Sequence, residues 1–403
     1  MTVAPVRVRW VIVGLILVAQ ALANVGPLGI PAIASLIRAD MDLTLAQAGS
    51  FLSAYYIGPI VASLPAGTLT DRWGIKRMLV LGQAVIAIGL LAVSASLTYA
   101  AFITLIAGAG LGYGILNPAS TKAVIAWAPP AQRATLVGFK QVGLPFGGVI
   151  GAALLPPLAL MLGWRWAVVA SALIIATATV ATLAIYRDPP RLPPPPVEAG
   201  ARSPMSTVLR NRDLWLLAGC TLVFAAMQTV WMSYLVLYLQ GVVGLSLIAA
   251  SGYLALAQFG GMLGRISFGV LSDRAFGGQR RLPLAIAGLG SALCSVAIAT
   301  TGPGTSGFWL TVLALVFGFV GIGWNGVQLT LLAELAGARA AGTAVGLGLA
   351  VSSAGVTLGP PVFGHFVTVS GSYTAPWLAL AAVMLAALAV LAFVRERPGL
   401  RGV

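Results

Sequence analysis

Long apolar stretches alternate with short polar connections from one end of the chain to the other. Each stretch is about 20 residues or longer, the length at which an α-helix crosses the roughly 30 Å hydrocarbon core of a bilayer. The stretches are continuous and lack the strict alternation of a membrane β-strand. The pattern predicts twelve membrane-spanning helices, at residues 10–33, 45–66, 78–98, 101–127, 134–160, 164–186, 213–239, 246–271, 282–300, 306–335, 341–369 and 375–394.

Composition agrees with this prediction. Of the 403 residues, 59% are hydrophobic and 8% are charged, whereas a soluble domain carries about 25% charged residues. The 49 glycines are expected where helices pack backbone to backbone in lipid. A soluble fold of this size could not bury so much apolar surface. We therefore predict an all-α membrane protein.

The net charge of +14 suggests a nucleic-acid partner until the positions of the charges are considered. Most arginines and lysines lie at the termini or in alternate loops, and the opposite loops hold only Arg38 and Arg165. This positive-inside pattern predicts cytoplasmic termini in a bacterial inner membrane and no nucleic-acid partner. Arg7 and Arg9 followed by ALAN at 21–24 also fit a signal peptide, but the apolar run continues through Ile37.

The longest polar stretch, RDPPRLPPPPVEAGARSPMSTVLRNRD at 187–213, divides the chain into two halves of six predicted spans. Its proline run favours polyproline II, a semi-rigid spacer that cannot continue a helix. We predict an N-terminal six-helix bundle over 1–186, a cytoplasmic linker over 187–212 and a C-terminal six-helix bundle over 213–403.

The two halves resemble copies of each other. GTLTDRWGIKR (67–77) follows the second span, and GVLSDRAFGGQRR (269–281) follows the eighth, with its Gly, Asp and Arg 202 residues later. Further matches occur at an offset of 208 residues, where Thr135, Gly138, Gly147 and Gly151 correspond to Thr343, Gly346, Gly355 and Gly359. Paired six-span repeats are the architecture of a rocking transporter whose site lies between the halves.

GTLTDRWGIKR resembles the signature loop of the major facilitator superfamily, roughly G-x-L-x-D-R-x-G-x-K/R-R. The resemblance extends over the whole chain and implies that superfamily's fold, twelve helices in two pseudo-symmetric bundles. In the superfamily this loop belongs to a conformational latch. The corresponding residues are Gly67, Asp71, Arg72, Arg77, Gly269, Asp273, Arg274 and Glu334.

Each latch residue has an expected role. Gly67 and Gly269 would let another helix approach closely. The aspartates would cap a helix or pair with arginine, and Glu334 would pair with Arg274 or its neighbours. A topology signal alone is the alternative role for this loop.

Polar side chains recur at helical spacing in spans 1, 4, 7 and 10, which line the central cavity in the superfamily. Residues three or four apart share a helix face, and polar groups in lipid are costly unless they face each other or water. We predict a wet cavity, with hydrogen bonds between helices as the alternative role. Its predicted lining is Gln20, Asn24, Tyr113, Asn117, Gln228, Trp231, Trp324, Asn325 and Gln328.

Arg265 and Lys140 are cations that lie inside predicted spans. Arg265 is eight residues before Asp273, roughly 12 Å along a helix, and Gln258 is seven residues earlier on the same face. Lys140, next to Gln141 in GFKQVGLPFGG (138–148), lies roughly 10 Å inside span 5. In the superfamily spans 5 and 8 pack side by side, so both cations would flank one cavity. Because no acid lies mid-span, we predict a small organic anion, a carboxylate, as substrate.

GRISFGVLSD also resembles span 8 of the oxalate/formate and monocarboxylate branch, in which an arginine contacts the substrate carboxylate. Arg265, Gly269 and Asp273 match that spacing. Span 11 has no lysine, which an oxalate carrier of this type would have. The resemblance therefore implies no particular substrate.

Other functions are less compatible with the sequence. GLPFGG (143–148) faintly resembles the span 5 motif of proton-coupled drug or cation exporters, but span 4 lacks their arginine. A neutral solute is the other alternative. No residue cluster suggests a metal, cofactor or enzyme active site. His365 is expected to pack or to relay a proton, and Cys220 and Cys294 lie inside spans.

The coupling mechanism stays open. Proton coupling would need Glu334, His365 or a protonated substrate, because no central carboxylate is present. Uniport and anion exchange are the alternatives. We expect a monomer in the lipid bilayer.

Overall fold

The computed structural model describes residues 6–127, 133–188, 204–337 and 340–396, and within them every regular element is a helix. Most of the linker predicted at 187–212 lies outside the described residues. The elements of the N-terminal half are α1 (Val6–Gly29), the 3₁₀ turn η1 (Ile30–Ile33), α2 (Ala34–Asp40), α3 (Leu45–Gly49), α4 (Phe51–Trp73), α5 (Ile75–Ser94), α6 (Tyr99–Trp127), α7 (Arg133–Leu162) and α8 (Trp164–Ile185). Those that follow are α9 (Pro204–Arg210), α10 (Arg212–Gly241), α11 (Leu247–Arg274), α12 (Arg281–Ala299), α13 (Gly307–Phe317), the π-helical turn η3 (Gly318–Ile322), α14 (Asn325–Ala336), α15 (Ala341–Ser370) and α16 (Thr374–Ala392).

The predicted all-α membrane fold is confirmed. Among the described residues, eleven helical stretches are long and apolar enough to cross a membrane. The remaining predicted span, 45–66, corresponds to α3 and α4, where the apolar helix Phe51–Ser63 is shorter. The first span continues to Asp40, because η1 and α2 extend α1 beyond the predicted end at residue 33.

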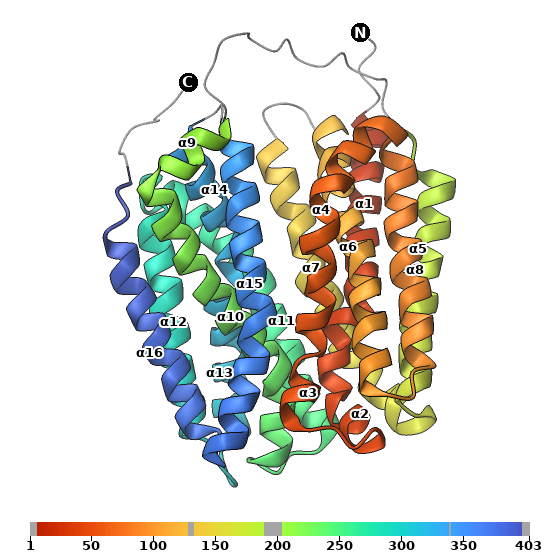
Figure 1. Ribbon diagram of the computed structural model, residues 1–403, viewed down its shortest axis with the longest axis vertical. Helices are drawn as coiled ribbons and strands as arrows, with labels where there is room; N and C mark the ends of the chain where they lie inside the picture. The colour runs from red at the N-terminus through yellow and green to blue at the C-terminus, as the bar shows by residue number, and fades with distance from the viewer. Residues whose placement is uncertain (1–5, 128–132, 189–203, 338–339, 397–403) are drawn as a thin grey trace.

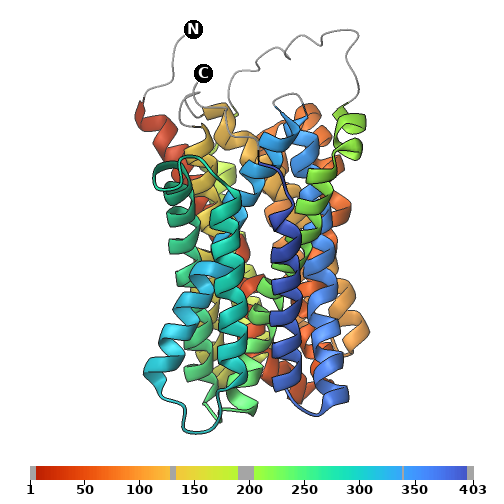
Figure 2. The same ribbon diagram turned by 90° about the vertical axis from the view of Figure 1, so that its left-hand side faces the viewer.

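The helices form two bundles. Figure 1 shows α1–α8 on one side of the molecule and α10–α16 on the other, and Figure 2 turns the second bundle toward the viewer. Close glycine contacts organise both bundles. A Cβ at Gly147 or Gly151 of α7 would come within 2.2 Å of a backbone oxygen of α1. A Cβ at Gly355 of α15 would come within 2.0 Å of a backbone oxygen of α10. Gly147 and Gly355, which are matched at the 208-residue offset, therefore make equivalent contacts.

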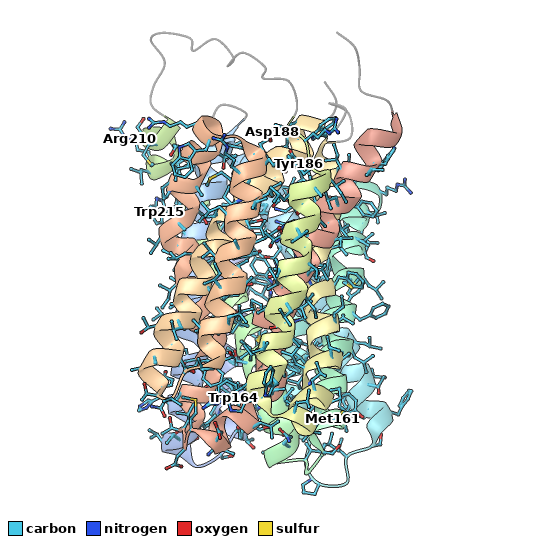
Figure 3. The ribbon with its side chains drawn as sticks, turned by 90° about the vertical axis from the view of Figure 1, so that its right-hand side faces the viewer. Met161, Trp164, Tyr186, Asp188, Arg210 and Trp215 are labelled. Atoms are coloured by element: carbon cyan, nitrogen blue, oxygen red, sulfur yellow. The ribbon has the colours of Figure 1, made fainter. Side chains whose placement is uncertain are left out.

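The two ends of the molecule differ in charge. We call the end at which α4 and α11 finish, with Arg72 and Arg274, the basic end. Figure 3 shows Asp188 and Arg210 at this end, and Trp164 and Met161 at the opposite end. The opposite end carries α2 and α3 (Figure 1). There Arg165 pairs with Asp40 at 3.3 Å.

The halves meet closely at the opposite end. Tyr234 of α10 is fully buried, and its hydroxyl donates to the backbone oxygen of Pro360 on α15 at 2.9 Å. Its hydroxyl is also 3.5 Å from the backbone oxygen of Leu45 on α3. Ser53 of α4 donates to the backbone oxygen of Val356 on α15 at 3.1 Å. These hydrogen bonds join α3 and α4 of the first half to α10 and α15 of the second.

Candidate functional site

Lys140 is buried between α6 and α7 and is held by neutral oxygen atoms. Its Nζ donates to the Asn117 backbone oxygen at 3.1 Å, to Asn117 Oδ1 at 2.6 Å and to Thr121 Oγ1 at 2.9 Å. Only 1% of the residue is exposed. Within the described part of the chain no carboxylate pairs with it. An ammonium group buried without a counterion is costly, so this position favours a negative charge nearby.

Arg265 extends from α11 across the boundary between the two halves. Its Nη1 donates to the backbone oxygen of Gln141 on α7 at 2.9 Å, which brings the guanidinium to the residue after Lys140. Its Nε is buried and has no hydrogen-bond partner among the described residues. Tyr56 and Tyr113 lie within electrostatic range of the guanidinium. The Arg265 guanidinium therefore lies at the contact between α7 and α11, one residue along α7 from Lys140, whose ammonium group contacts α6.

A neutral polar cluster occupies the equivalent position in the C-terminal half. Gln228 Oε1 accepts hydrogen bonds from Trp324 Nε1 and Asn325 Nδ2, both at 3.1 Å. Trp324 and Asn325 follow η3, a π-helical turn of the kind that often occurs at functional sites. Asn117 and Asn325 are 208 residues apart. In the first half this asparagine binds a cation, and in the second half it binds an amide.

Four of the predicted amide side chains are buried with an unsatisfied polar atom. Asn24 donates to the Gln20 backbone oxygen at 2.6 Å, but its Oδ1 has no partner within the described residues. Among the same residues, Nε2 of Gln20, Gln258 and Gln328 also has no partner. All four side chains belong to residues that are at most 2% exposed. Because buried polar groups are nearly always hydrogen-bonded, these atoms point to a ligand or water.

The structure does not bring every predicted lining residue to this region. Trp231 stacks on Phe317 with ring centroids 3.8 Å apart, and its Nε1 donates to Ser295 Oγ at 3.0 Å. It is therefore part of the packed interior of the C-terminal half. Tyr113 lies 6.0 Å from Tyr56, measured between ring centroids, and faces the Arg265 region.

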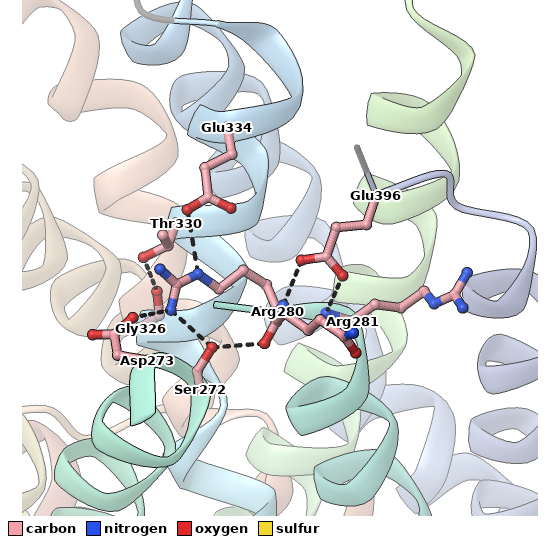
Figure 4. A network of polar contacts seen from close by, with 9 residues as sticks. Ser272, Asp273, Arg280, Arg281, Gly326, Thr330, Glu334 and Glu396 are labelled. Atoms are coloured by element: carbon pink, nitrogen blue, oxygen red, sulfur yellow. Dashed lines mark hydrogen bonds and ion pairs between the residues drawn. The ribbon is translucent and has the colours of Figure 1, made fainter. Parts of the chain in front are cut away.

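At the basic end, Arg280 is the centre of the C-terminal latch cluster (Figure 4). Asp273 forms an ion pair with its Nη1, and Glu334 accepts from its Nε at 3.2 Å. Ser272 Oγ also accepts from its Nη1, at 2.8 Å. Partial burial disfavours the charged form, but the hydrogen bonds and negative charges of Asp273 and Glu334 outweigh it and raise the pKa of Arg280. This cluster joins α11, α12 and α14.

Some latch predictions need correction in detail. The partner of Glu334 is Arg280, whereas Arg274 is exposed and forms no ion pair among the described residues. The reason is geometric, because α11 ends at Arg274 and the following turn brings Arg280 back over it. A Cβ at Gly67 or Gly269 would meet no atom within 4 Å, so neither glycine is in a close helix contact here. Arg72 and Arg77 are exposed, and the side chain of Asp71 lies outside the described residues.

Two carboxylates at the basic end were not predicted. Glu396 accepts from the backbone N–H groups of Arg280 and Arg281, at the start of α12 (Figure 4). Asp188 accepts from the backbone N–H of Lys76 at 2.8 Å, at the start of α5. Carboxylates stabilise helix N-termini. Asp188 and Glu396 are 208 residues apart, so the repeat offset was the sequence signal for this pair.

Comparisons with known proteins agree with this architecture. The chain is 26% identical over 410 residues to the probable sulfoacetate transporter SauU of Cupriavidus necator, covering 94% of this chain and 92% of that protein. It is 23% identical over 376 residues to the hexuronate transporter of Bacillus subtilis, covering 90% and 89%. Its fold matches a crystal structure of a bacterial homologue to the human lysosomal transporter Spinster, in an inward-facing and occupied conformation.

That structural match has a TM-score of 0.78 at 18% identity, and it covers 98% of this chain and all of the other. The family model described as Major Facilitator Superfamily matches residues 12–360. The eleven long apolar helical stretches and the shorter apolar helix of the described residues, their two bundles, the duplicated loop and these similarities lead to one conclusion. The protein belongs to the Major Facilitator Superfamily of transporters.

Proposed function

We propose that the protein is a secondary transporter that moves a small organic anion, a carboxylate, by alternating access between its two halves. The observation that carries the proposal is the position of Arg265. Its guanidinium crosses from α11 to the backbone of Gln141 on α7, with one N–H buried and unsatisfied within the described residues. A charge-assisted hydrogen bond to an anion would satisfy that group. An anion bound there would contact both halves at once.

Lys140 supports the same substrate charge. Lys140 precedes Gln141 in the chain, and its ammonium group is buried. The side chains that bind this group, Asn117 and Thr121, are neutral. A lipophilic cation would meet two positive side chains with no carboxylate paired to either in the described residues. The electrostatic field at this contact therefore disfavours the alternative of a drug or cation exporter.

Relatives of the protein are consistent with an anionic substrate. Sulfoacetate and hexuronate, named for the two relatives above, are both organic anions. The neutral cluster of Gln228, Trp324 and Asn325 is the observation that favours a neutral solute instead. The two substrates differ in their dependence on Arg265, because only an anion needs its charge.

We also infer an orientation and a role for the basic end. Its arginines support a cytoplasmic position in a bacterial cell under the positive-inside rule. The Asp273–Arg280–Glu334 cluster then works as a cytoplasmic latch that favours one access state. The contacts of Tyr234 and Ser53 at the opposite end agree with a conformation that is closed there.

Uptake by proteoliposomes tests the proposal. Arg265→Gln keeps hydrogen-bonding capacity but removes the charge, and Arg210→Gln removes an exposed charge from α9 as the matched control. Loss of one charge-assisted hydrogen bond is worth about 1.5–3 kcal/mol, or roughly 10- to 150-fold in apparent affinity for a carboxylate. Equal carboxylate uptake by both variants, or uptake of cations alone, would refute anion transport.

A further inference from the structure

The two buried cations differ in how many hydrogen-bond donors they still have. A lysine ammonium has three N–H donors. Lys140 uses three contacts, all to α6: two to oxygens of Asn117 and one to Thr121 Oγ1. With its donors committed and 1% of the residue exposed, Lys140 has none left for a substrate. It instead fastens α7 to α6.

Arg265 is in the opposite situation. A guanidinium has five N–H donors in a planar fork. One donor binds Gln141, and the Nε donor is buried without a partner in the described part of the chain. Of the two cationic side chains, only Arg265 therefore has a free donor that can bind an anionic group.

The register of α11 on α7 places other polar atoms at a defined distance from that guanidinium. Arg265 reaches Gln141, and Gln258 lies against Gly148, where a Cβ would be 2.6 Å from its amide. The two contacts are seven residues apart on each helix, and the helices run antiparallel. Seven residues correspond to about 10 Å of helix. Gln258 therefore lies about two turns from Arg265 along the same contact.

A hydrogen-bond acceptor lies on the same part of α7. Asn24 of α1 packs against Gly147, where a Cβ would be 2.9 Å from the Asn24 Cβ. Gln258 Nε2 is an unsatisfied donor and Asn24 Oδ1 an unsatisfied acceptor, and both residues are at most 1% exposed. They flank the adjacent glycines of α7. A hydroxyl group both donates and accepts, so it would satisfy both atoms.

We propose that the site binds a hydroxylated monocarboxylate, with its single anionic group on Arg265 and a hydroxyl group at Gln258 and Asn24. This inference rests on the proposed function and narrows its substrate class. Lys140 is a positioning residue that holds Asn117 and α6 in place. A dicarboxylate is disfavoured because its second carboxylate would have no free cationic donor. An unhydroxylated fatty acid would leave Gln258 and Asn24 unsatisfied.

Binding to the purified full-length protein tests this class with three six-carbon probes. They are gluconate, which is a hydroxylated monocarboxylate, hexanoate, which has no hydroxyl group, and the dicarboxylate adipate. We expect gluconate to bind at least tenfold more tightly than either of the others. Tighter binding of adipate than of gluconate, or equal binding of hexanoate and gluconate, would overturn the inference and leave anion transport standing. No binding of any carboxylate would overturn the proposed function itself.

Variants separate the roles of the two polar residues. Gln258→Leu should collapse the gluconate-to-hexanoate affinity ratio toward one and should raise the melting temperature of the unliganded protein, because it removes a buried unsatisfied amide. If Gln258 instead held the helices together by hydrogen bonds, the substitution would lower the melting temperature and preserve the ratio. Gln258→Asn is the second variant, which keeps the amide but shortens its reach, and should also reduce the ratio.

Lys140→Met should lower the melting temperature and weaken gluconate and adipate binding by the same factor. A selective loss of adipate binding in Lys140→Met would show that Lys140 is itself an anion ligand. That result would overturn the proposal that the substrate has a single anionic group, bound by Arg265.

Discussion

Closure of the opposite end depends on Gly49 and Gly364, which leave room for the Tyr234 hydroxyl. A Cβ at Gly364 of α15 would lie 2.0 Å from the Tyr234 hydroxyl and 2.7 Å from the Ala46 Cα of α3. Moving the tyrosine alone cannot relieve the second contact, because it involves backbone of the other half. We therefore expect Gly364→Ala to push the two halves apart at this end.

The size of the effect follows from the contacts that are lost. Breaking the hydrogen bond from Tyr234 to Pro360 costs about 1 kcal/mol net, and overpacking a close contact costs about 1–3 kcal/mol. Together they disfavour the closed arrangement by about 2–4 kcal/mol, or roughly 30- to 700-fold in the ratio of the two states. Gly346→Ala is the control. Gly346 lies in the same helix as Gly364, and a Cβ at Gly346 would meet no atom within 4 Å.

Thiol labelling measures this shift. Ser53→Cys places a thiol at the closed contact, where Ser53 is 3% exposed, after the buried Cys220 and Cys294 have been replaced by alanine. A membrane-impermeant maleimide should label it at least tenfold faster with Gly364→Ala and at an unchanged rate with Gly346→Ala. Equal rates in both backgrounds would refute the steric reasoning.

Three further substitutions have expected outcomes. Arg280→Ala leaves the carboxylates of Asp273 and Glu334 without their partner. We therefore expect faster maleimide labelling of a cysteine introduced at the basic end and a lower melting temperature, and Arg274→Ala is the exposed control. Glu396→Gln weakens a charged cap at the start of α12, and circular dichroism melts should show a loss of about 0.5–2 kcal/mol. Trp231→Ala should destabilise the protein by about 3–5 kcal/mol through a cavity beside Phe317, and unchanged melting would show that it does not pack there.

The sequence was sufficient to predict the helices because lipid makes the pattern simple. A span must be apolar over its whole length. Eleven of the twelve predicted spans accordingly correspond to described helical stretches that are long and apolar enough to cross a membrane. The exception follows from the interruption between α3 and α4 at Ser50 and from the polar end of α4. The equivalent contacts of Gly147 and Gly355 were also predictable, because the two glycines share the repeat offset of 208 residues.

The hydrogen bonds of the candidate site could not be predicted in the same way. Spacing placed Lys140 and Arg265 inside the membrane, but the binding of Lys140 to Asn117 depends on how α6 and α7 pack. Likewise, the prediction that Glu334 pairs with Arg274 or its neighbours did not identify Arg280, which the turn between α11 and α12 brings to Glu334. Such contacts depend on side-chain direction across several helices, which a helical period does not specify.

The role of Tyr234 could not be predicted from the sequence for a related reason. In the sequence it is an aromatic residue in an apolar span, and nothing local distinguishes it from packing residues. Its contacts come from α3 and α15, which are far from it along the chain. The contact with Leu45 and the close approach of Gly49 and Gly364 to its hydroxyl identify it as part of the contact between halves.

The charge of the substrate at Arg265 is the central claim, and one paired measurement tests it most directly. Isothermal titration of the purified protein with gluconate and with gluconamide compares two ligands that differ in a single charged group. We expect gluconate to bind at least tenfold more tightly to the wild-type protein, and the difference to disappear in Arg265→Gln. Equal affinities for both ligands in the wild-type protein would contradict an anionic substrate held by this guanidinium.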